Sequence, residues 1–490
     1  MASAVEFEPA DGESIATGAG RLATQIARRI EETVIGRGWP VGESLGSESD
    51  LRARYGVGRP VLREAVRLVE HHQVARMRRG PHGGLFVCAP DGEPAIHAMV
   101  IYLEYVGTRV TDLLEARSLL EPVAAQLAAD RITEDGITTL RDALRDEHAH
   151  LSGPQCWAQD PVHALLGRLS GNPVLHLFID VLARLTTRYA HASGRRSAAE
   201  VDAARQDSHA AHRAIAEAVI DGDGARAQVA LTAHLEFLST WVDLRRARRA
   251  APAAETGFDC ATAPTGKLAE VLASRIHDDI AARGWPVGTV VGSETDLVTR
   301  YGISRPALRE AVRLLEYHSV ARMRPGPGGG LIVTEPEPQA SVDTIALLLE
   351  YERVTTDDLR IVRNALELGI IGRVTARLAD ADGELSDRLG DAADEPCPNQ
   401  LFHTELAAVA GNPVLTLFLS VVMELSHRHP AGDPSAPGDT PGDDPPPAHH
   451  RILDAIRQGD TALARHRMRR HLGALAHRPG ARPDPNYRIE

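Results

Sequence analysis

The spacing of apolar and polar residues divides the chain into two kinds of region. Residues 22–34 have helical spacing, as do the runs SESDLRARYG and VGRPVLREAVRLVEHH that follow a GRGWPVG turn. Ser47 and Asp50 have the spacing of a capping box, and Pro60 stands where the first turn of a helix tolerates proline. The next run, VARMRRGPHGGLFV, has two apolar stretches around a Gly-rich tip. The pattern predicts three helices followed by a two-stranded wing, which is a winged helix-turn-helix.

The whole pattern occurs twice. Residues 21–87 align with residues 267–333 without a gap at an offset of 246, and 41 of these 67 positions are identical. The offset is 240 at the two GNPVL runs, which begin at Gly171 and Gly411, and 237 at the last helices. The sequence therefore predicts a tandem duplication of one unit of about 230 residues.

The remainder of each unit is rich in Ala and Leu and repeats helical spacing. It predicts six or seven helices in an antiparallel bundle. In the first unit these helices are expected at 95–106, 111–130, 134–151, 156–170, 173–191, 198–220 and 223–245. The predicted fold class is mainly α: two winged helix-turn-helix domains with short β wings, each followed by an all-α helical bundle.

The expected domain boundaries follow the repeat. They are a disordered tail at 1–18, a winged domain at 19–90, a helical domain at 94–245, a linker at 246–264, a second winged domain at 265–335, a second helical domain at 340–478 and a tail at 479–490. Within the second helical domain, residues 430–447 are acidic and rich in Pro and Gly, which predicts a disordered loop.

Composition narrows the class of protein. A chain of 52.8 kDa is too large for one ordinary hydrophobic core, so several cores are expected. Because aromatic residues make up only 4%, these cores must consist mainly of Ala, Leu, Val and Ile. The four cysteines are far apart, so neither a disulfide scaffold nor a cysteine zinc site is expected. We find no signal peptide and no apolar run of about 18 residues. These features predict a cytoplasmic, nucleoid-associated protein.

The net charge of −13 argues at first against a nucleic-acid partner. The charge is unevenly distributed, however. Residues 21–87 carry a net charge of +5 and residues 267–333 a net charge of +2, which leaves −20 for the rest of the chain. The acidic balance therefore belongs to the helical domains, and the two predicted winged domains are basic.

The third predicted helix of each winged domain has an arginine face. In the first copy Leu62, Ala65, Val66 and Val69 form the inward stripe. The opposite face carries Arg59, Arg63 and Arg67, and in the second copy Arg305, Arg309 and Arg313. Guanidinium groups in such a row can clamp phosphates or bind guanine N7 and O6, as recognition helices do. The alternative is a solvated charged face.

The run SE..L..RYG.(G/S)RP.LREAVR.LE with its Gly-rich wing resembles the winged helix-turn-helix of GntR-type bacterial transcription regulators. The helices that follow resemble the FCD effector domain of the FadR subfamily. The resemblance implies DNA contacts from Arg59, Arg63, Arg305 and Arg309, and from the wing tips at His82, Gly83, Gly328 and Gly329. Members often have an arginine where this chain has Ser49 and Thr295, so the operator preference is left open.

Histidines give the helical domains a candidate metal site. His212 and His234 lie ten residues before and twelve after Gly222, so a helical hairpin places them at similar heights. His449 and His471 flank Gly459 in the same way. His163 or His403 supplies a third imidazole, with Gln159 or Asn399 one turn earlier as an oxygen ligand. This set suits zinc or a similar divalent ion with positions open for an anion, although solvated or core histidines are the alternative. The resemblance supports a metal, because metal-binding FCD domains use three histidines, usually with an aspartate.

Arg117 and Arg363 each precede a glutamate by four residues, which predicts an intrahelical ion pair. The resemblance implies instead that they face the effector cavity and hold a carboxylate. We therefore predict a ligand-responsive repressor that binds a palindromic operator as an intramolecular pseudo-dimer or a homodimer. A metal-dependent enzyme and an architectural DNA-binding protein are the alternatives; no HExxH, nucleophile or phosphate-loop motif supports an enzyme.

Overall fold

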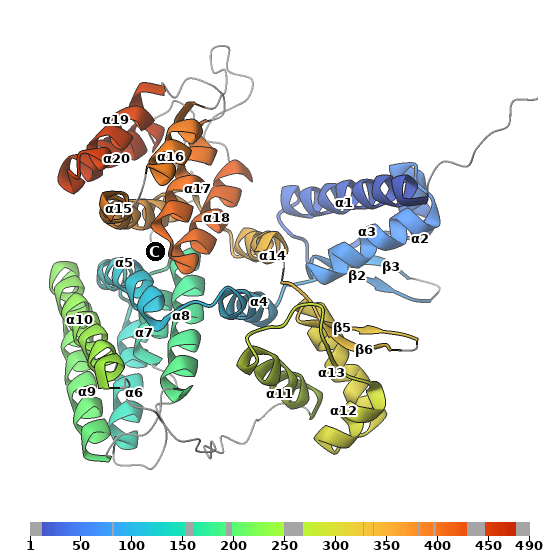
Figure 1. The fold of residues 1–490 in the computed structure, drawn as a ribbon, viewed down its shortest axis with the longest axis horizontal. Helices are drawn as coiled ribbons and strands as arrows, with labels where there is room; N and C mark the ends of the chain where they lie inside the picture. Colours follow the sequence, from blue (N-terminus) through green and yellow to red (C-terminus); the bar gives the residue numbers. More distant parts are fainter. Residues whose placement is uncertain are drawn as a thin grey trace, which may run out of the picture. The chain divides into compact units, whose positions relative to one another are not determined.

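A computed structural model describes residues 12–80, 83–151, 161–192, 198–248, 268–326, 328–336, 338–380, 383–394, 398–428 and 446–476. The protein is mainly α-helical with two small sheets, which confirms the predicted fold class (Figure 1). It forms two compact units. The first contains Met1–Ala95 and Asp343–Arg353, and the second contains Ile96–Val342 and Val354–Glu490.

The first winged domain begins with α1 (Gly12–Gly36), followed by α2 (Glu48–Tyr55) and α3 (Arg59–His71). The predicted capping box starts α2, because the Ser47 hydroxyl accepts a hydrogen bond from the Asp50 amide at 3.2 Å and the Asp50 carboxylate accepts one from the Ser47 amide at 3.0 Å. The tail predicted at 1–18 is wrong in its last part, since α1 begins at Gly12. Extending a helix that is already nucleated costs little, so polar residues join it without an apolar stripe.

A three-stranded antiparallel sheet completes this domain. It consists of β1 (Ser44–Gly46), β3 (Gly84–Val87) and β2 (Ala75–Arg78), in that spatial order. The two wing strands were predicted, but β1 was not. Its three residues show no alternation, and only pairing with β3 makes them a strand.

The second winged domain repeats the first. Its elements are α11 (Leu268–Ala282), β4 (Val290–Gly292), α12 (Glu294–Tyr301), α13 (Arg305–Tyr317), β5 (Ala321–Arg324) and β6 (Gly330–Val333). The strand order is again β4-β6-β5, and the register of the wing is the same, because Met323 pairs with Leu331 as Met77 pairs with Leu85. Ser304 caps α13, with its hydroxyl accepting a hydrogen bond from the Ala307 amide at 3.4 Å.

The core of the first winged domain includes residues from α14 (Pro338–Tyr351), the helix that follows the second winged domain in the chain. Leu347 is buried in this core, and the Tyr351 ring meets the edge of Trp39 with centroids 5.6 Å apart. Both residues belong to the same compact unit as the first winged domain. A helix from the second copy therefore completes the first copy's winged domain.

The reciprocal contact exists in the other unit. Helix α4 (Gly92–Tyr105) follows the first winged domain, yet Ile101 is buried in the core of the second, and Tyr105 meets Trp285 at 5.7 Å. The prediction that residues 95–106 belong to the following helical bundle is therefore wrong. Apolar spacing shows that this helix buries a face, but it does not show which surface receives that face.

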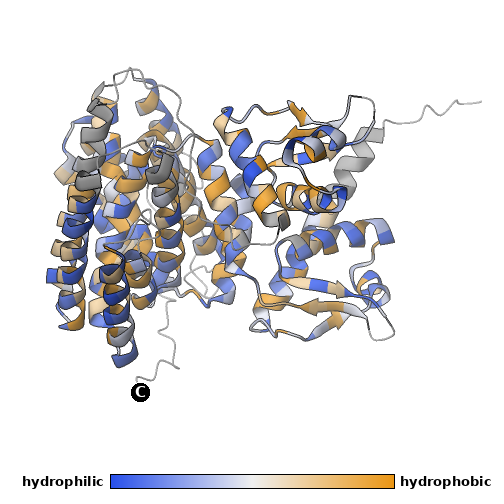
Figure 2. Ribbon diagram, turned by 90° about the horizontal axis from the view of Figure 1, so that it is seen from below, coloured by the Kyte–Doolittle hydropathy of each residue, from blue (hydrophilic) through white to orange (hydrophobic). Residues whose placement is uncertain are grey.

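Among the described residues, each helical bundle has six helices. The first comprises α5 (Val110–Asp130), α6 (Glu134–His150), α7 (Pro161–Leu169), α8 (Pro173–Ala192), α9 (Ala198–Ile220) and α10 (Gly224–Arg248). The second comprises α15 (Thr356–Asp380), α16 (Glu384–Asp394), α17 (Pro398–Ala410), α18 (Pro413–Arg428), α19 (Pro446–Arg457) and α20 (Thr461–Ala476). Their apolar faces turn toward one another, as the hydropathy colouring in Figure 2 shows.

Several predicted segments lie partly or wholly outside the described residues. Helix α10 continues to Arg248, and most of the predicted linker 246–264 lies outside the description. The loop predicted at 430–447 lies outside the described residues up to residue 445, and α19 begins at Pro446. The tail predicted at 479–490 is also outside. Among the described residues, we find no helix whose length and apolarity would allow it to cross a membrane.

Candidate nucleic-acid interface and metal centre

Helix α3 presents the predicted arginine face. Leu62, together with Ala65, Val66 and Val69, is buried in the winged domain. The side chains of Arg59, Arg63 and Arg67 are 69%, 72% and 77% exposed. Arg305, Arg309 and Arg313 are likewise exposed on α13. Both helices therefore turn a row of guanidinium groups to solvent. The tight connection from α2 to α3 begins at Gly56, the C-cap of α2, whose φ of 65° favours glycine.

A glutamate on the preceding helix lies beside each row. The Glu48 carboxylate is 3.6 Å from Arg59 and 3.9 Å from Arg63, and Glu294 is 3.2 Å from Arg309. Exposed ion pairs of this kind are weak, so a phosphate can replace the carboxylate at little cost.

The wing tips have a steric reason for their glycines. A Cβ at Gly83 or Gly329 would collide with the carbonyl oxygen of the strand residue it faces, Arg78 or Arg324. Gly328 has a φ of 71°, and His82 lies outside the described residues. The wing also exposes arginines that we did not predict, namely Arg76, Arg78, Arg79, Arg322 and Arg324. Their signal was their place on predicted wing strands of a basic domain.

Three buried histidines meet in the first bundle. His163 comes from α7, His212 from α9 and His234 from α10, and all are at most 3% exposed. The Nε2 atom of His212 is 3.2 Å from that of His163 and 3.1 Å from that of His234. The hairpin argument for His212 and His234 is thus confirmed.

The second bundle contains the same arrangement. His403 from α17, His449 from α19 and His471 from α20 are buried. The Nε2 atom of His471 is 3.2 Å from those of both other histidines. Each group has the ligand-atom spacing that could hold a metal ion. Of the expected oxygen ligands, Gln159 lies outside the described residues, and Asn399 lies on α17 without a described side chain.

A buried carboxylate orients one histidine in each group. Glu121 accepts a hydrogen bond from Arg117 Nε at 2.6 Å and lies 2.5 Å from His163 Nδ1. When Nδ1 donates its proton to a carboxylate, Nε2 keeps a lone pair that faces the other imidazoles. Burial opposes ionisation of Glu121, but Arg117 and His163 outweigh it and lower the pKa of this carboxyl to about 2.

Glu367 repeats this role in the second copy. It accepts from Arg363 Nε at 2.6 Å and forms an ion pair with His403 Nδ1. Burial opposes ionisation here too, and His403 and Arg363 together lower the pKa of Glu367 to about 2. The intrahelical ion pairs predicted for Arg117 and Arg363 are therefore present. Their extension to the histidines was not predicted, because it depends on the packing of α7 and α17.

The second carboxylate of the first group is Glu147. Its side chain, on α6, lies 2.7 Å from His212 Nδ1 and 2.9 Å from His209 Nδ1. No spacing rule connects residues this far apart in sequence, so Glu147 could not be found from sequence. It fixes His212 as Glu121 fixes His163.

Comparison with known proteins identifies two kinds of domain in this chain. The family model for bacterial regulatory proteins of the gntR family matches residues 22–87, and the FCD domain model matches residues 112–237 and 358–474. The HTH-type transcriptional repressor NanR of Enterobacter sp. is 26% identical over 227 residues, which cover 45% of this chain and 85% of that protein. The Uxu operon regulator of Haemophilus influenzae is 29% identical over 157 residues, which cover 32% of this chain and 57% of that protein. A solved structure, Streptococcus agalactiae GntR, has 24% identity and a TM-score of 0.31, and covers 46% of this chain and 99% of that chain.

The fold and the matched domains define a DNA-binding protein in which winged domains are joined to helical effector domains. More particularly, the chain is a GntR-type transcriptional regulator with FCD effector domains, the FCD domain being present twice. The domains and the relatives indicate a regulator and not an enzyme.

Proposed function

We propose that this regulator is a FadR-type repressor that reads a palindromic operator with both winged domains of one chain and responds to a small carboxylate effector. The observation that carries the proposal is the presence of two equivalent exposed arginine rows on one chain. A palindrome presents two equivalent half-sites, which normally require two chains. Here one chain supplies both recognition helices.

The arginine rows on α3 and α13 enter the major groove in this proposal. Arg63 and Arg309, in the middle of the rows, bind base edges or phosphates, with their neighbours and the wing tips at His82, Gly83, Gly328 and Gly329 along the backbone. Selection of bound genomic fragments would first identify the operator. Arg63→Ala and Arg309→Ala should then each weaken binding and reduce its salt slope by about 1.

Arg145→Ala is the matched control, because this arginine is 75% exposed but lies on a bundle helix. Unchanged affinity and salt slope in both test variants would contradict the recognition-helix assignment. The stoichiometry of the complex is the second readout. One chain per short palindrome supports the proposal that a single chain binds both half-sites, and two chains per palindrome contradict it.

Each histidine group holds a divalent metal in our proposal. Three imidazole lone pairs that face one another are stabilised when a cation lies between them, and the buried carboxylates increase the basicity of the ligands. When bound, the metal would act as a Lewis acid with open positions for an anionic ligand. Protein prepared without chelators should contain two metal ions per chain.

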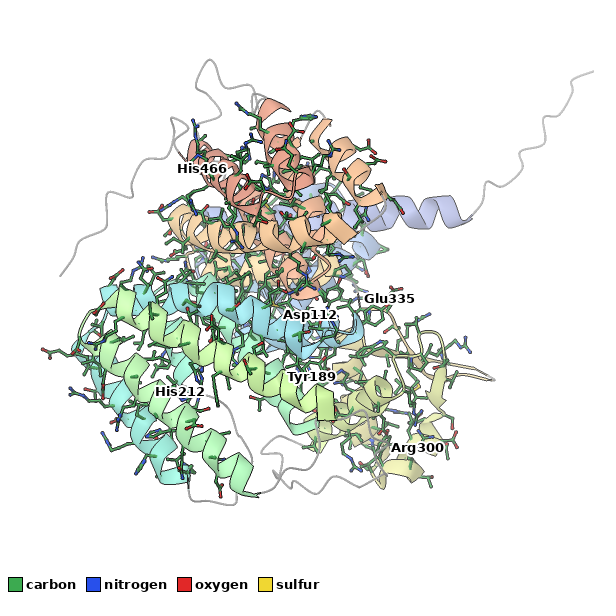
Figure 3. The ribbon with its side chains drawn as sticks, turned by 60° about the vertical axis from the view of Figure 1, so that its left-hand side comes forward. Asp112, Tyr189, His212, Arg300, Glu335 and His466 are labelled. Carbon is green, nitrogen blue, oxygen red and sulfur yellow. The ribbon has the colours of Figure 1, made fainter. Side chains whose placement is uncertain are left out.

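The metal assignment is tested by His471→Ala, with His466→Ala as the control. His466 is an exposed residue on the same helix α20 (Figure 3). Metal content should fall from two ions to one per chain only in the first variant. Absence of metal in the unmodified protein, with no ligand-induced shift of its melting temperature, would favour bundles that serve only as a scaffold.

Arg117 and Arg363 hold the effector carboxylate in this proposal. Both guanidinium groups are anchored through Nε by the glutamate that also contacts a histidine. The Arg363 Nη2 atom is buried without a hydrogen-bond partner among the described residues, and a carboxylate would satisfy it. Effector binding would shift the population of conformations and weaken operator binding. Small carboxylates should raise the melting temperature of the native chain, should raise that of Arg363→Gln less, and should not raise that of the double variant Arg117→Gln, Arg363→Gln.

A further inference from the structure

The two helical bundles meet through equivalent surfaces of the two copies. Phe178 and Phe418, which are related by the offset of 240, stack with ring centroids 3.9 Å apart and planes inclined by 9°. Asn172 donates a side-chain hydrogen bond to the Asp358 carbonyl at 3.1 Å, and the equivalent Asn412 donates one to the Asp112 carbonyl at 3.1 Å. The interface thus has the reciprocal contacts of a two-fold dimer.

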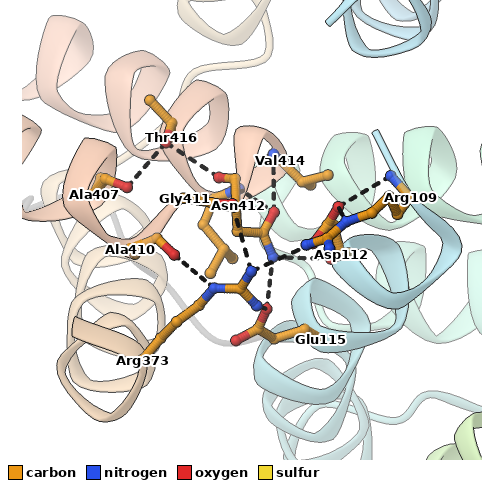
Figure 4. Close-up of polar contacts among 11 residues, drawn as sticks. Arg109, Asp112, Glu115, Arg373, Ala407, Ala410, Gly411, Asn412, Val414 and Thr416 are labelled. Carbon is orange, nitrogen blue, oxygen red and sulfur yellow. Dashed lines mark hydrogen bonds and ion pairs between the residues drawn. The ribbon is translucent and has the colours of Figure 1, made fainter. Parts of the chain in front are cut away.

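One half of this interface contains a charge pair. Arg373 on α15 forms an ion pair with Glu115 on α5 and lies 3.5 Å from Asp112 (Figure 4). Asn412 donates a hydrogen bond to the Glu115 carboxylate at 2.8 Å. In the other half, the offset of 246 places Ile361 at the position of Glu115 and Leu127 at the position of Arg373. An apolar pair therefore occupies the position that a charged pair occupies in the first half.

The two halves of the interface between the bundles also differ in the volumes of their paired side chains. A Cβ built on Gly369 of α15 would lie 2.9 Å from Leu119 Cγ on α5, and closer still to its two methyl groups. Leu119 therefore fills the space that the missing side chain of Gly369 leaves. In the other half the equivalent positions are Ala365 and Val123, so the larger residue is at the other position of the pair but again on the first copy.

We infer that the two bundles are complementary halves of a heterotypic interface, and that the partner of each bundle is the other bundle of the same chain. If two first-copy bundles paired with each other, Glu115 of each would lie opposite Leu127 of the other. Leu119 of each would also be crowded against Val123 of the other. Such pairing is disfavoured by unpaired charge and by overpacking, which are the usual means of excluding a wrong partner.

Two second-copy bundles would be mismatched in the opposite way. Arg373 would face Ile361 without its carboxylate, and Ala365 opposite Gly369 would leave a cavity. Only the mixed pair matches both charge and volume. The linker between the copies also raises their effective concentration for one another above that of a second chain.

This inference rests on the proposed single-chain pseudo-dimer, but its tests need neither operator nor effector. A negative result in the interface tests would therefore not change the interpretation of the DNA and metal experiments. A negative result in those experiments would likewise not affect the tests below.

The first test exchanges the four diverged positions in the full-length chain. The first-copy exchange is Glu115→Ile, Leu119→Ala, Val123→Gly and Leu127→Arg; the second-copy exchange is Ile361→Glu, Ala365→Leu, Gly369→Val and Arg373→Leu. Either exchange alone creates two like faces and should lower the midpoint of thermal unfolding by several degrees. Both exchanges together restore a mixed pair, with its halves interchanged, and should recover most of the lost stability.

If the two exchanges were independent, the combined variant would lose the sum of their two stability losses. A combined variant that is no more stable than this sum predicts would overturn the inference. If a single exchange prevents folding altogether, recovery of folded protein in the combined variant gives the same answer. A smaller version uses Gly369→Val, which should destabilise the chain, and its rescue by Leu119→Ala, which reproduces the Ala365–Val123 pair.

The second test asks whether the partner is on the same chain. Two full-length chains with different affinity tags are co-expressed and purified through one tag. We expect no recovery of the other tag and a mass of 52.8 kDa by sedimentation. Recovery of both tags, or twice this mass, would show pairing between chains and contradict the proposed partner.

Discussion

In each histidine group three Nε2 atoms face one another, but different side chains orient the imidazole rings in the two groups. In the first group Glu147 of α6 contacts His212 Nδ1 at 2.7 Å. In the second group the equivalent His449 stacks on Phe402, with ring centroids 4.3 Å apart and planes inclined by 18°. The position equivalent to Phe402 in the first copy is Val162. The comparison teaches that the ligand geometry is set by helix packing, while charge or stacking can fix an individual ring.

What the groups share is the buried arginine–glutamate–histidine contact, and its loss should have the largest effect. Glu121→Gln leaves the buried Arg117 without its counter-charge, and Glu367→Gln does the same to the half-buried Arg363; losing one partner of a buried ion pair costs about 3–5 kcal/mol of unfolding free energy. The cost should be greater for Glu121→Gln, because the Arg117 side chain is 3% exposed and that of Arg363 is 14% exposed. Chemical unfolding of both variants measures this, and equal losses of under 1 kcal/mol would contradict it.

Glu147→Gln should separate the two groups. Loss of a carboxylate that orients a ligand typically lowers metal affinity by a factor of about 10–100. We expect this loss at one of the two proposed sites only, so that competition with a chelator shows one weakened and one unchanged ion per chain. Phe402→Leu is the matched variant for the other group. Two sites weakened together by Glu147→Gln would refute independent support.

The winged domains also differ in the partner of one equivalent tyrosine, Tyr55 in the first copy and Tyr301 in the second. The Tyr301 hydroxyl donates to Asp279 at 2.5 Å; burial and this partner raise the pKa of Tyr301 to about 12, whereas Thr33 occupies the position of Asp279 in the first copy. Because the folded pKa lies above the ordinary value near 10, this bond stabilises the fold below pH 10, and the stabilisation is lost as pH rises toward 12. Absorbance titration should show a tyrosine that ionises near pH 12 and that Tyr301→Phe removes. Its persistence in that variant would exclude Tyr301 as its source.

The smallest predicted difference concerns the helix caps. Ser304 caps α13 with its side chain, whereas Gly58 begins α3 without a side-chain hydrogen bond. Gly58→Ser should therefore stabilise the first winged domain by a few tenths of a kcal/mol, because the backbone at Gly58, with φ −72°, suits serine. Thermal unfolding compares it with the reverse change, Ser304→Gly. A destabilising Gly58→Ser would show that the two caps are not equivalent.

Local features of the fold were the most predictable. The capping box of Ser47 and Asp50, the cap at Ser304 and the wing strands depend on neighbours within a few residues. The meeting of His212 with His234 was predictable too, because a hairpin of two regular helices fixes the heights of its residues. In each case the relevant geometry is set by short-range backbone hydrogen bonds.

Features that depend on long-range packing were missed. Strand β1 exists only by pairing with β3, and α4 and α14 complete winged domains of the other copy. The Glu147–His212 contact joins residues brought together by the packing of α6 on α9. Periodicity identifies an apolar face, but several surfaces can bury it at a similar gain in free energy.

The sequence by itself determined the internal repeat, the helical class, the basic winged domains with their arginine faces and the histidines that could meet. These follow from local propensity, charge and repeat spacing. Only the tertiary structure decided which copy completes which core, which carboxylates hold the histidines and how Arg373 finds Glu115 across the interface. The physical reason is that side-chain complementarity acts between residues far apart in sequence, and it selects one arrangement only when the elements are packed together.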